Sequence, residues 1–554
     1  MSAAAPANPA SLASSAGATA VKPGVNPWLV AVTVSMATFM EVLDVSIANV
    51  SLRHIAGDMG AGPSESTWVL TSYLVSNAVV LPISGWLSSV VGRKRFYMIC
   101  VAVFAGSSLL CGLAPSLGWL LFFRVLQGIG GGGLAPSEQA ILADTFPPAK
   151  RGMAFAVYGV AVVVAPAIGP ALGGWITDNY DWRWIFFINL PIGALSLFLT
   201  GRLVQDSDNA KREHADVWRG GLKIDYVGFV LVCLGLGALQ VVLDKGQEED
   251  WFGSSFIVTF AVLCAVGLVG LVVWEVWGTR DPVVDLPLLR NKSFAASNLF
   301  MFIVGFVLNS TTVLIPQFVQ DLLGYDATHA GLLLMPGGFV LMLMFPLAGR
   351  LSGLVQPKYL IVVGLLATSA AMFHLTGFSD QASFGTLAWA RIYLVVGLPL
   401  FFISINVLAY GGLPPGKTNN ASALVNLMRN LGGSIGIAVA ITLLDRRQQV
   451  HRDRLVSNLT PYDPAFQQRL TGGHGVWGGG GDYASVPAPA GLGAGGGGHG
   501  GGSSLAAIAE EVRRQAMLLS YLDVFKIMAV CTLCTIVFVP LLRRVRTGEQ
   551  AQGH

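Results

Sequence analysis

Fourteen apolar stretches, each about 20 residues and so long enough to cross a bilayer, most constrain what this 554-residue chain can fold into. In hydrocarbon every backbone polar group must find its partner inside the segment, which favours helices. Only 12% of the residues are charged, about half of the ~25% that is typical of soluble proteins. The sequence therefore excludes a water-soluble globular protein and predicts an all-α integral membrane bundle.

We expect a disordered tail at residues 1–26, which are rich in Ala, Ser and Pro and lack the regions of a signal peptide. The expected membrane helices follow it. They cover residues 27–49, 67–90, 96–114, 117–141, 153–177, 184–203, 225–244, 255–277, 293–320, 329–351, 358–378, 385–411, 419–444 and 519–542.

Lysine and arginine gather in alternate loops. The short loops on one side hold only Arg53, Arg183 and Lys245, and the other side holds most of the rest. Because cytoplasmic loops carry an excess of positive charge, we expect both termini in the cytoplasm. Residues 445–517 do not count in this comparison, since long loops translocate regardless of charge. We expect them to form a periplasmic Gly-rich loop with a short amphipathic helix at 505–517.

The chain repeats parts of its own sequence. Three residues of the fourth span recur with the same spacing in the twelfth: Gly118, Arg124 and Gly130 against Gly385, Arg391 and Gly397. The segment Gly85–Lys94 likewise matches Gly349–Lys358. The two offsets are 267 and 264 residues. Repeated halves are typical of secondary transporters. We expect six-helix bundles at 27–203 and 293–542, two linker helices with their loops at 204–292, and a cytoplasmic tail at 543–554.

Two carboxylates lie in the first span. Asp44 follows Glu41 by three residues, which places both on one helix face. A charge in hydrocarbon costs at least ~2.5–3.5 kcal/mol and is by default a functional hypothesis. Neighbouring carboxylates are costly to ionise together, which favours proton uptake and release by one of them. The alternatives are a carboxylate that reaches water or stays paired with an arginine and, for Glu41, contact with a cationic substrate.

Arg124 in the fourth span is the expected partner of these carboxylates. It acts either as a switchable counter-ion or as a permanent interhelical ion pair that fixes the packing. Arg391 and Arg429 also lie in spans, and for them we expect a structural role. Four aromatic residues are candidates to line a cavity for flat apolar cations through cation–π contact: Phe39, Trp68, Tyr73 and Tyr158.

The segment Gly411–Thr418 reads GGLPPGKT, which matches the pattern of a phosphate-binding loop. Such a loop follows a β-strand in a soluble domain, whereas a membrane span precedes this one, and Pro414 and Pro415 lack the amides that would bind phosphate. We therefore expect no ATP binding. The sequence shows no metal-ligand cluster and no nucleophile–base set, so we expect no metal, no cofactor and no enzyme. A net charge of +3 does not indicate nucleic-acid binding.

Five segments together are specific for one family. They are Leu43–Leu52 (LDVSIANVSL), Gly85–Arg95 (GWLSSVVGRKR), Arg124–Gly132 (RVLQGIGGG), Ala165–Trp175 (APAIGPALGGW) and Trp182–Gly193 (WRWIFFINLPIG). With them the chain resembles the major facilitator superfamily, and more narrowly its 14-helix drug:proton antiporters of the EmrB/QacA type. It departs from the pattern at Ser89, where the loop motif usually has Asp, and at Arg53, where the first-helix motif often has Pro.

The resemblance implies roles for particular residues. Asp44 and Arg124, with Glu41, would couple transport to protons. A cytoplasmic loop motif comprises Gly85, Gly92, Arg93 and Lys94. A Gly/Pro antiporter motif, which lets helices approach closely and bends the fifth span, comprises Pro166, Gly169, Pro170, Gly173 and Gly174.

The function that the resemblance implies is proton-driven export of amphiphilic, often cationic, compounds across a bacterial inner membrane by alternating access. Some relatives work with a periplasmic adaptor and an outer-membrane channel, which makes both candidate partners. Two alternatives stay open. One is a proton-driven exporter of a single dedicated metabolite, lipid or siderophore, and the other is a membrane sensor that transports nothing.

Overall fold

The computed structural model describes residues 25–219, 224–279, 282–325, 327–379, 382–411, 413, 417–459 and 500–542. Within these residues fourteen helical segments are long and apolar enough to cross a membrane, as expected for an all-α membrane bundle. Most of both predicted tails, residues 460–499 of the predicted loop, and Gly412 and residues 414–416 of the GGLPPGKT segment lie outside the described residues.

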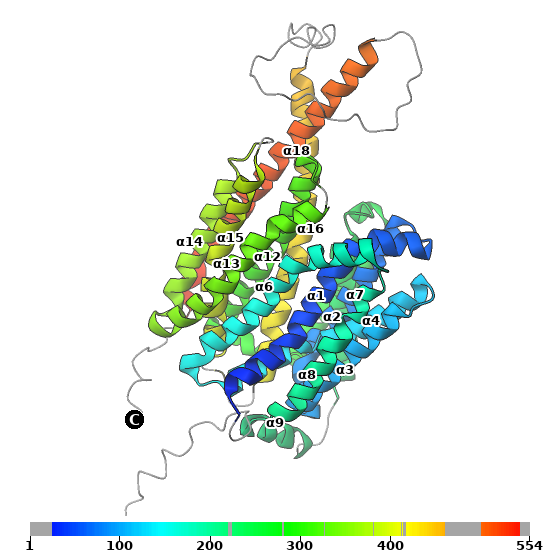
Figure 1. Cartoon of the computed structure of the whole chain (residues 1–554). Helices are drawn as coiled ribbons and strands as arrows, with labels where there is room; N and C mark the ends of the chain where they lie inside the picture. The colour runs from blue at the N-terminus through cyan, green and yellow to red at the C-terminus, as the bar shows by residue number, and fades with distance from the viewer. Residues whose placement is uncertain are drawn as a thin grey trace, which may run out of the picture.

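The first six spans form one half of the molecule (Figure 1). Their helices are α1 (Pro27–Met59), α2 (Pro63–Val91), α3 (Arg93–Gly112), α4 (Leu117–Gly131) with α5 (Leu134–Thr145), α6 (Pro148–Asn179), and α7 (Trp184–Phe187) with α8 (Asn189–Leu203). Next come α9 (Asp208–Arg219), outside the candidate spans, and the two linker spans α10 (Tyr226–Lys245) and α11 (Ser255–Val273).

The last six spans form the other half (Figure 1). They are α12 (Lys292–Leu323), α13 (Ala327–Leu354), α14 (Pro357–Leu375), α15 (Phe384–Ala409), α16 (Thr418–Asn458) and α18 (Gly500–Cys534). The helix α9 lies at one end of the bundle, hereafter the α9 end, and the ends of α16 and α18 extend beyond the other (Figure 1).

Several expected boundaries differ from the structure: α1, for example, runs to Met59 rather than to residue 49. Two differences change the architecture. The fourth span is interrupted, because α4 ends before Gly132 and α5 begins after Gly133. Glycine is a poor helix former, and here it also admits close neighbours. A Cβ on Gly132 would lie 2.8 Å from the carbonyl oxygen of Asn77, and one on Gly133 would lie 2.5 Å from Cys100 Sγ.

The second difference concerns the predicted 445–517 loop, whose two ends are helical. Helix α16 continues to Asn458, and α18 begins at Gly500 rather than near 505. Side chains of the α16 extension contact α18: His451 Nε2 lies 2.9 Å from Asp523 Oδ2, and Arg447 Nη1 lies 3.6 Å from the same oxygen. These cross-helix contacts give the polar extension of α16 a partner on α18, so the helix does not end where its apolar run ends.

The two halves meet mainly where α6 packs against α13 and α16 against α2. At the α9 end, the contact between α6 and α13 depends on glycines. A Cβ on Gly349 of α13 would lie 3.0 Å from the carbonyl oxygen of Gly152 and 3.0 Å from the Cα of Met153, both on α6. Both neighbours are backbone atoms, so the helices approach as closely as their main chains allow.

Candidate functional site

A cavity of about 330 Å³ lies between the two halves. Its walls come from α1, α2, α4, α5 and α6 on one side, from α12, α13, α15 and α16 on the other, and from the linker helix α10. Apolar side chains such as Leu308, Leu334 and Leu341 line much of it. Of the described residues, three charged ones also line it: Glu41, Arg391 and Arg429. A mostly apolar cavity with a few charged groups suits an amphiphilic ligand.

On the α9 side of this cavity, hydrogen bonds join the halves. Gln139 Oε1 on α5 accepts from Asn426 Nδ2 on α16 and from Tyr410 Oη, each at 2.9 Å. Nearby, Ser422 Oγ donates to the carbonyl oxygen of Pro136 at 2.6 Å. In this conformation the halves are therefore bound together between the cavity and the α9 end.

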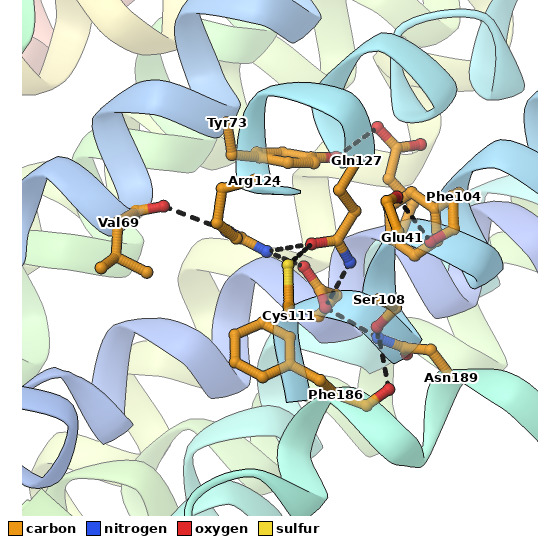
Figure 2. A network of polar contacts seen from close by, with 12 residues as sticks. Glu41, Val69, Tyr73, Phe104, Ser108, Cys111, Arg124, Gln127, Phe186 and Asn189 are labelled. Carbon is orange, nitrogen blue, oxygen red and sulfur yellow. Dashed lines mark hydrogen bonds and ion pairs between the residues drawn. The ribbon is translucent and has the colours of Figure 1, made fainter. Parts of the chain in front are cut away.

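Asp44 and Arg124 form a buried ion pair beside the cavity. Arg124 Nη1 lies 2.6 Å from Asp44 Oδ2, and the two residues are 0% and 2% exposed. Gln127 Nε2 and Asn189 Nδ2 donate to the other carboxylate oxygen at 2.9 and 2.7 Å (Figure 2). Arg124 Nε also donates to the carbonyl oxygen of Val69 at 3.0 Å. The pair thus ties α1, α2, α4 and α8 together.

Aromatic rings connect this pair to Glu41. The Arg124 guanidinium lies 4.6 Å from the centre of the Tyr73 ring and 5.6 Å from that of Phe186, at cation–π distance. Tyr73 Oη donates to Glu41 Oε1 at 3.2 Å, and Asn77 Nδ2 donates to the same oxygen at 3.0 Å (Figure 2). Glu41 lines the cavity, whereas neither Asp44 nor Arg124 does. The structure therefore brings all three predicted residues together but gives only Glu41 direct access to a ligand.

A further buried carboxylate escaped the sequence analysis. Glu138 on α5 is 0% exposed and accepts hydrogen bonds from the hydroxyls of Ser35 and Thr38 on α1. Its position inside the expected fourth span could have identified it as a candidate, because a carboxylate in hydrocarbon is a functional hypothesis by default. Gln127 and Asn189, by contrast, are uncharged; they lie within the family segments Arg124–Gly132 and Trp182–Gly193, but no spacing rule singled out these two side chains.

The four aromatic candidates are dispersed. Tyr73 lines the cavity. Tyr158 is buried, donates to Asn426 Oδ1 at 3.5 Å and accepts from Arg429 Nη1. Trp68 packs edge-on against Phe256 of α11, and Phe39 packs in the apolar core of the N-terminal half. Only Tyr73 of the four is placed to contact a ligand in this cavity.

The loop motif lies at the α9 end. Gly92 has φ +92°, a conformation that side chains disfavour, and a Cβ on Gly85 would lie 3.0 Å from the Cα of Asn420 on α16. Arg93 Nη1 lies 2.5 Å from Asp144 Oδ2 on α5. The main-chain amide of Lys94 donates to Asp206 Oδ1 at 2.8 Å, and its ammonium donates to the carbonyl oxygen of Gly201 at 2.9 Å.

Ser89, which replaces the usual carboxylate of that motif, donates to the carbonyl oxygens of Gly85 and Trp86 within its own helix. The carboxylates around the motif come from other elements instead. Asp144 lies on α5, and Glu213 on α9 has Oε2 3.7 Å from Arg93 Nη2. The carboxylate of Asp144 thus pairs with Arg93 at the α9 end, where Ser89 offers none.

The Gly/Pro motif lies on α6 and contacts both halves. A Cβ on Gly169 would lie 2.3 Å from Ser46 Oγ, and one on Gly173 would lie 2.9 Å from Ile47 Cγ2, both on α1. Pro166 lines the cavity, and Pro170 lies against Gly331 of α13. Gly174 is partly buried on the same helix. The glycines 169 and 173 thus fix α6 to its own half, and the prolines meet the other half.

Two six-helix halves around a central cavity, with a buried carboxylate–arginine pair next to it, define a membrane transporter. A model of the Major Facilitator Superfamily matches residues 34–437. The chain belongs to this superfamily, and within it to the EmrB type.

Curated relatives agree with this assignment. The chain is 39% identical over 441 residues to "Multidrug export protein EmrB" of Haemophilus influenzae, with 79% of this chain and 84% of the relative covered. It is 37% identical over 439 residues to "Fatty acid resistance protein FarB" of Neisseria gonorrhoeae, with 79% and 85% covered. Among solved structures, the proton:xylose symporter XylE has a TM-score of 0.56 at 15% identity, with 77% of this chain and 90% of that chain covered, and supports the fold alone.

Proposed function

We propose that the protein is a proton-coupled exporter of amphiphilic compounds, including drugs, that works by alternating access. The observation that carries the proposal is the ion pair of Asp44 and Arg124, buried next to a central cavity that Glu41 lines. The export of drugs is supported by the relatives, several of which are named as multidrug export or resistance proteins.

We propose that the α9 end faces the cytoplasm. The excess of lysine and arginine in the loops at this end supports this orientation. The conformation described here is then closed toward the cytoplasm by the hydrogen bonds of Gln139 and Ser422. Amphiphilic substrates would leave the cavity on the opposite side.

In this proposal the proton acts on the Asp44 network. A proton on Asp44 neutralises the carboxylate and leaves Arg124 without its counter-ion, which weakens the contacts between α1 and α4. Glu41 is connected to the same arginine through the Tyr73 ring and lines the cavity. A ligand that binds near Glu41 therefore changes the electrostatic surroundings of the pair, which couples substrate binding to proton release.

We also propose that the ends of α16 and α18 contact a periplasmic adaptor that leads to an outer-membrane channel. These ends extend from the side opposite α9 and are linked through His451 and Asp523. A helical pair that extends beyond the bundle offers such a partner a defined surface.

The test is substrate-induced proton release from inverted vesicles, with a panel of lipophilic cations and neutral amphiphiles. We expect several unrelated compounds to release protons with the wild type and none with Asp44→Asn. Asp58→Asn, on the same helix but with a carboxylate that is 51% exposed, is the matched control and should behave as the wild type. Proton release that persists in Asp44→Asn would refute the role of Asp44, and the absence of any response in the wild type would refute the function.

A further inference from the structure

The linker helix α10 is attached to both halves of the molecule. It packs against α2 of the N-terminal half and also contacts α16 of the C-terminal half. Gln240 on α10 and Ser434 on α16 both line the cavity, and Ser434 Oγ donates to Gln240 Oε1 at 3.0 Å. The end of α10 opposite α9 makes further contacts with each half. If the halves change their separation during transport, α10 cannot keep all of these contacts.

The attachment of α10 to α2 is made by charged groups. Lys245 is 1% exposed, its Nζ donates to the hydroxyl of Thr67, and the same Nζ lies 5.4 Å from the centre of the Trp68 ring. Asp244 accepts a hydrogen bond from Thr71 Oγ1. A buried charge that loses its partners is costly. We therefore expect this end of α10 to stay on the N-terminal half.

At the same end, the attachment to α16 depends on an uncharged side chain. Gln247, just after α10, donates through Nε2 to Asp445 Oδ2 on α16 at 2.6 Å. Its Oε1 accepts from Thr442 Oγ1 at 3.2 Å and from Trp251 Nε1 at 2.8 Å. Because two donors hold the oxygen, the amide nitrogen is directed to Asp445. Gln247 is only partly buried, so water can replace Asp445 as its partner at small cost.

The backbone that follows Gln247 is shaped to orient this side chain. Asp250 and Trp251 have φ of +57° and +48°, in the left-handed region that residues other than glycine seldom adopt. The turn brings the Trp251 ring against Gly246, where an added Cβ would lie 2.7 Å from Cζ3 of the ring. Strained backbone persists where its surroundings enforce it, and such strain gathers at clamps and switch regions. The strain supports a role for Gln247 beyond filling space.

We propose that α10 moves with the N-terminal half and that Gln247 is a latch residue, which binds Asp445 while the α9 end is closed and releases it when that end opens. Halves that rock about a central cavity change their separation at both ends. A hydrogen bond of 2.6 Å tolerates little displacement, so the latch favours the closed conformation. This inference rests on the alternating access of the proposed function, but on neither its substrates nor its protons.

The test measures spin-label distances in the full chain in nanodiscs. Labels on Arg95 of α3 and Arg350 of α13, both exposed, report whether the α9 end is open or closed. We expect Gln247→Glu, which places a second carboxylate against Asp445, to raise the ratio of open to closed molecules by about tenfold or more, the range for a lost hydrogen bond to a charged group. Gln247→Lys, whose cation attracts Asp445, should leave this ratio at or below the wild-type value.

Gln449→Glu and Gln449→Lys make the same two changes at an exposed glutamine of α16, and they should both leave the ratio unchanged. A rise of similar size in Gln247→Glu and Gln247→Lys would indicate a general loss of packing and would overturn the inference. An unchanged ratio in Gln247→Glu would overturn it as well. Proton release from vesicles reads out the proposed function separately, and it can succeed while the latch test fails, which distinguishes the two failures.

Discussion

Glu213 on α9 accepts a hydrogen bond from Asn419 Nδ2 at the start of α16, at 3.2 Å and across 206 residues of sequence. The same carboxylate lies 3.7 Å from Arg93 in the N-terminal half. A short helix outside the membrane spans therefore links the two halves at the α9 end. Since the halves must separate there if the cavity is to open to that side, this link favours the closed conformation.

The link should give the protein a pH-dependent stability. Burial raises the pKa of Glu213 from 4.5 to about 7, while Arg93, Asn419 and Lys417 act in the opposite direction and Asp144 in the same one. Between these values the folded protein holds a proton that the unfolded chain has released, so the stability contributed by Glu213 falls as pH rises through this interval. We expect the Tm of Glu213→Gln to fall less than that of the wild type between about pH 5 and about pH 7.5.

Asp216→Asn, which changes an exposed carboxylate of the same helix, is the control for that measurement and should follow the wild type. If the Tm profiles of Glu213→Gln and the wild type run parallel, Glu213 does not titrate in this range.

Replacing one residue of the Asp44–Arg124 pair should lower the stability more than replacing both. Asp44→Asn leaves a buried arginine without its counter-ion, and the loss of one partner of a buried pair costs about 3–5 kcal/mol. The double variant Asp44→Asn with Arg124→Gln removes both charges, so it should regain most of the stability but no proton coupling. Thermal unfolding and vesicle proton release measure the two effects. A double variant less stable than both single variants would contradict the prediction.

Tyr73 has two separable contacts. Tyr73→Phe removes the hydroxyl that donates to Glu41, a loss of about 0.5–1.5 kcal/mol, and keeps the ring over Arg124. Tyr73→Leu also removes the cation–π contact, and this causes a further loss of at most about 2 kcal/mol at a desolvated site. We expect the free energy of unfolding to be lower for Tyr73→Phe than for the wild type, and lower again for Tyr73→Leu. Equal effects of the two substitutions would show that the ring contact contributes nothing.

The glycine contact between α6 and α13 should control the closed conformation. Gly349→Ala places a Cβ 3.0 Å from backbone atoms of Gly152 and Met153, which cannot move without shifting α6. Gly353→Ala, one turn further along α13, meets nothing closer than 3.6 Å and is the matched control. Spin-label distances across the α9 end should lengthen in Gly349→Ala and stay unchanged in Gly353→Ala. Unchanged distances in both would mean that this contact does not hold the halves together.

Much of the fold and part of the site could be predicted from the sequence, because hydrocarbon imposes strict demands. Apolar length located the fourteen spans, and the cost of intramembrane charge singled out Asp44, Glu41 and Arg124. The sequence predicted a structural role for Arg391, and only coordinates reveal that, within the described part of the chain, its buried Nε and Nη1 atoms have no hydrogen-bond partner.

The remaining features depend on tertiary contacts that no local pattern encodes. Helix α9 carries mostly polar residues and was expected as part of a loop, yet His214 and Trp218 bind the carbonyl oxygens of Ser89 and Val90 at the end of α2. The break at Gly132 and the extension of α16 likewise follow from neighbours distant in sequence.

The prolines of α6 have a consequence for where water enters. Pro166 and Pro170 have no amide hydrogen, so the carbonyl oxygens of Val162 and Pro166 lose their usual helical partners. Val162 and Pro166 both line the cavity. Water in the cavity can therefore satisfy these acceptors, whereas the face of α6 that holds Gly169 and Gly173 is packed against α1. We therefore expect water to reach α6 first on its cavity side, and the two halves of the molecule to separate first along that side.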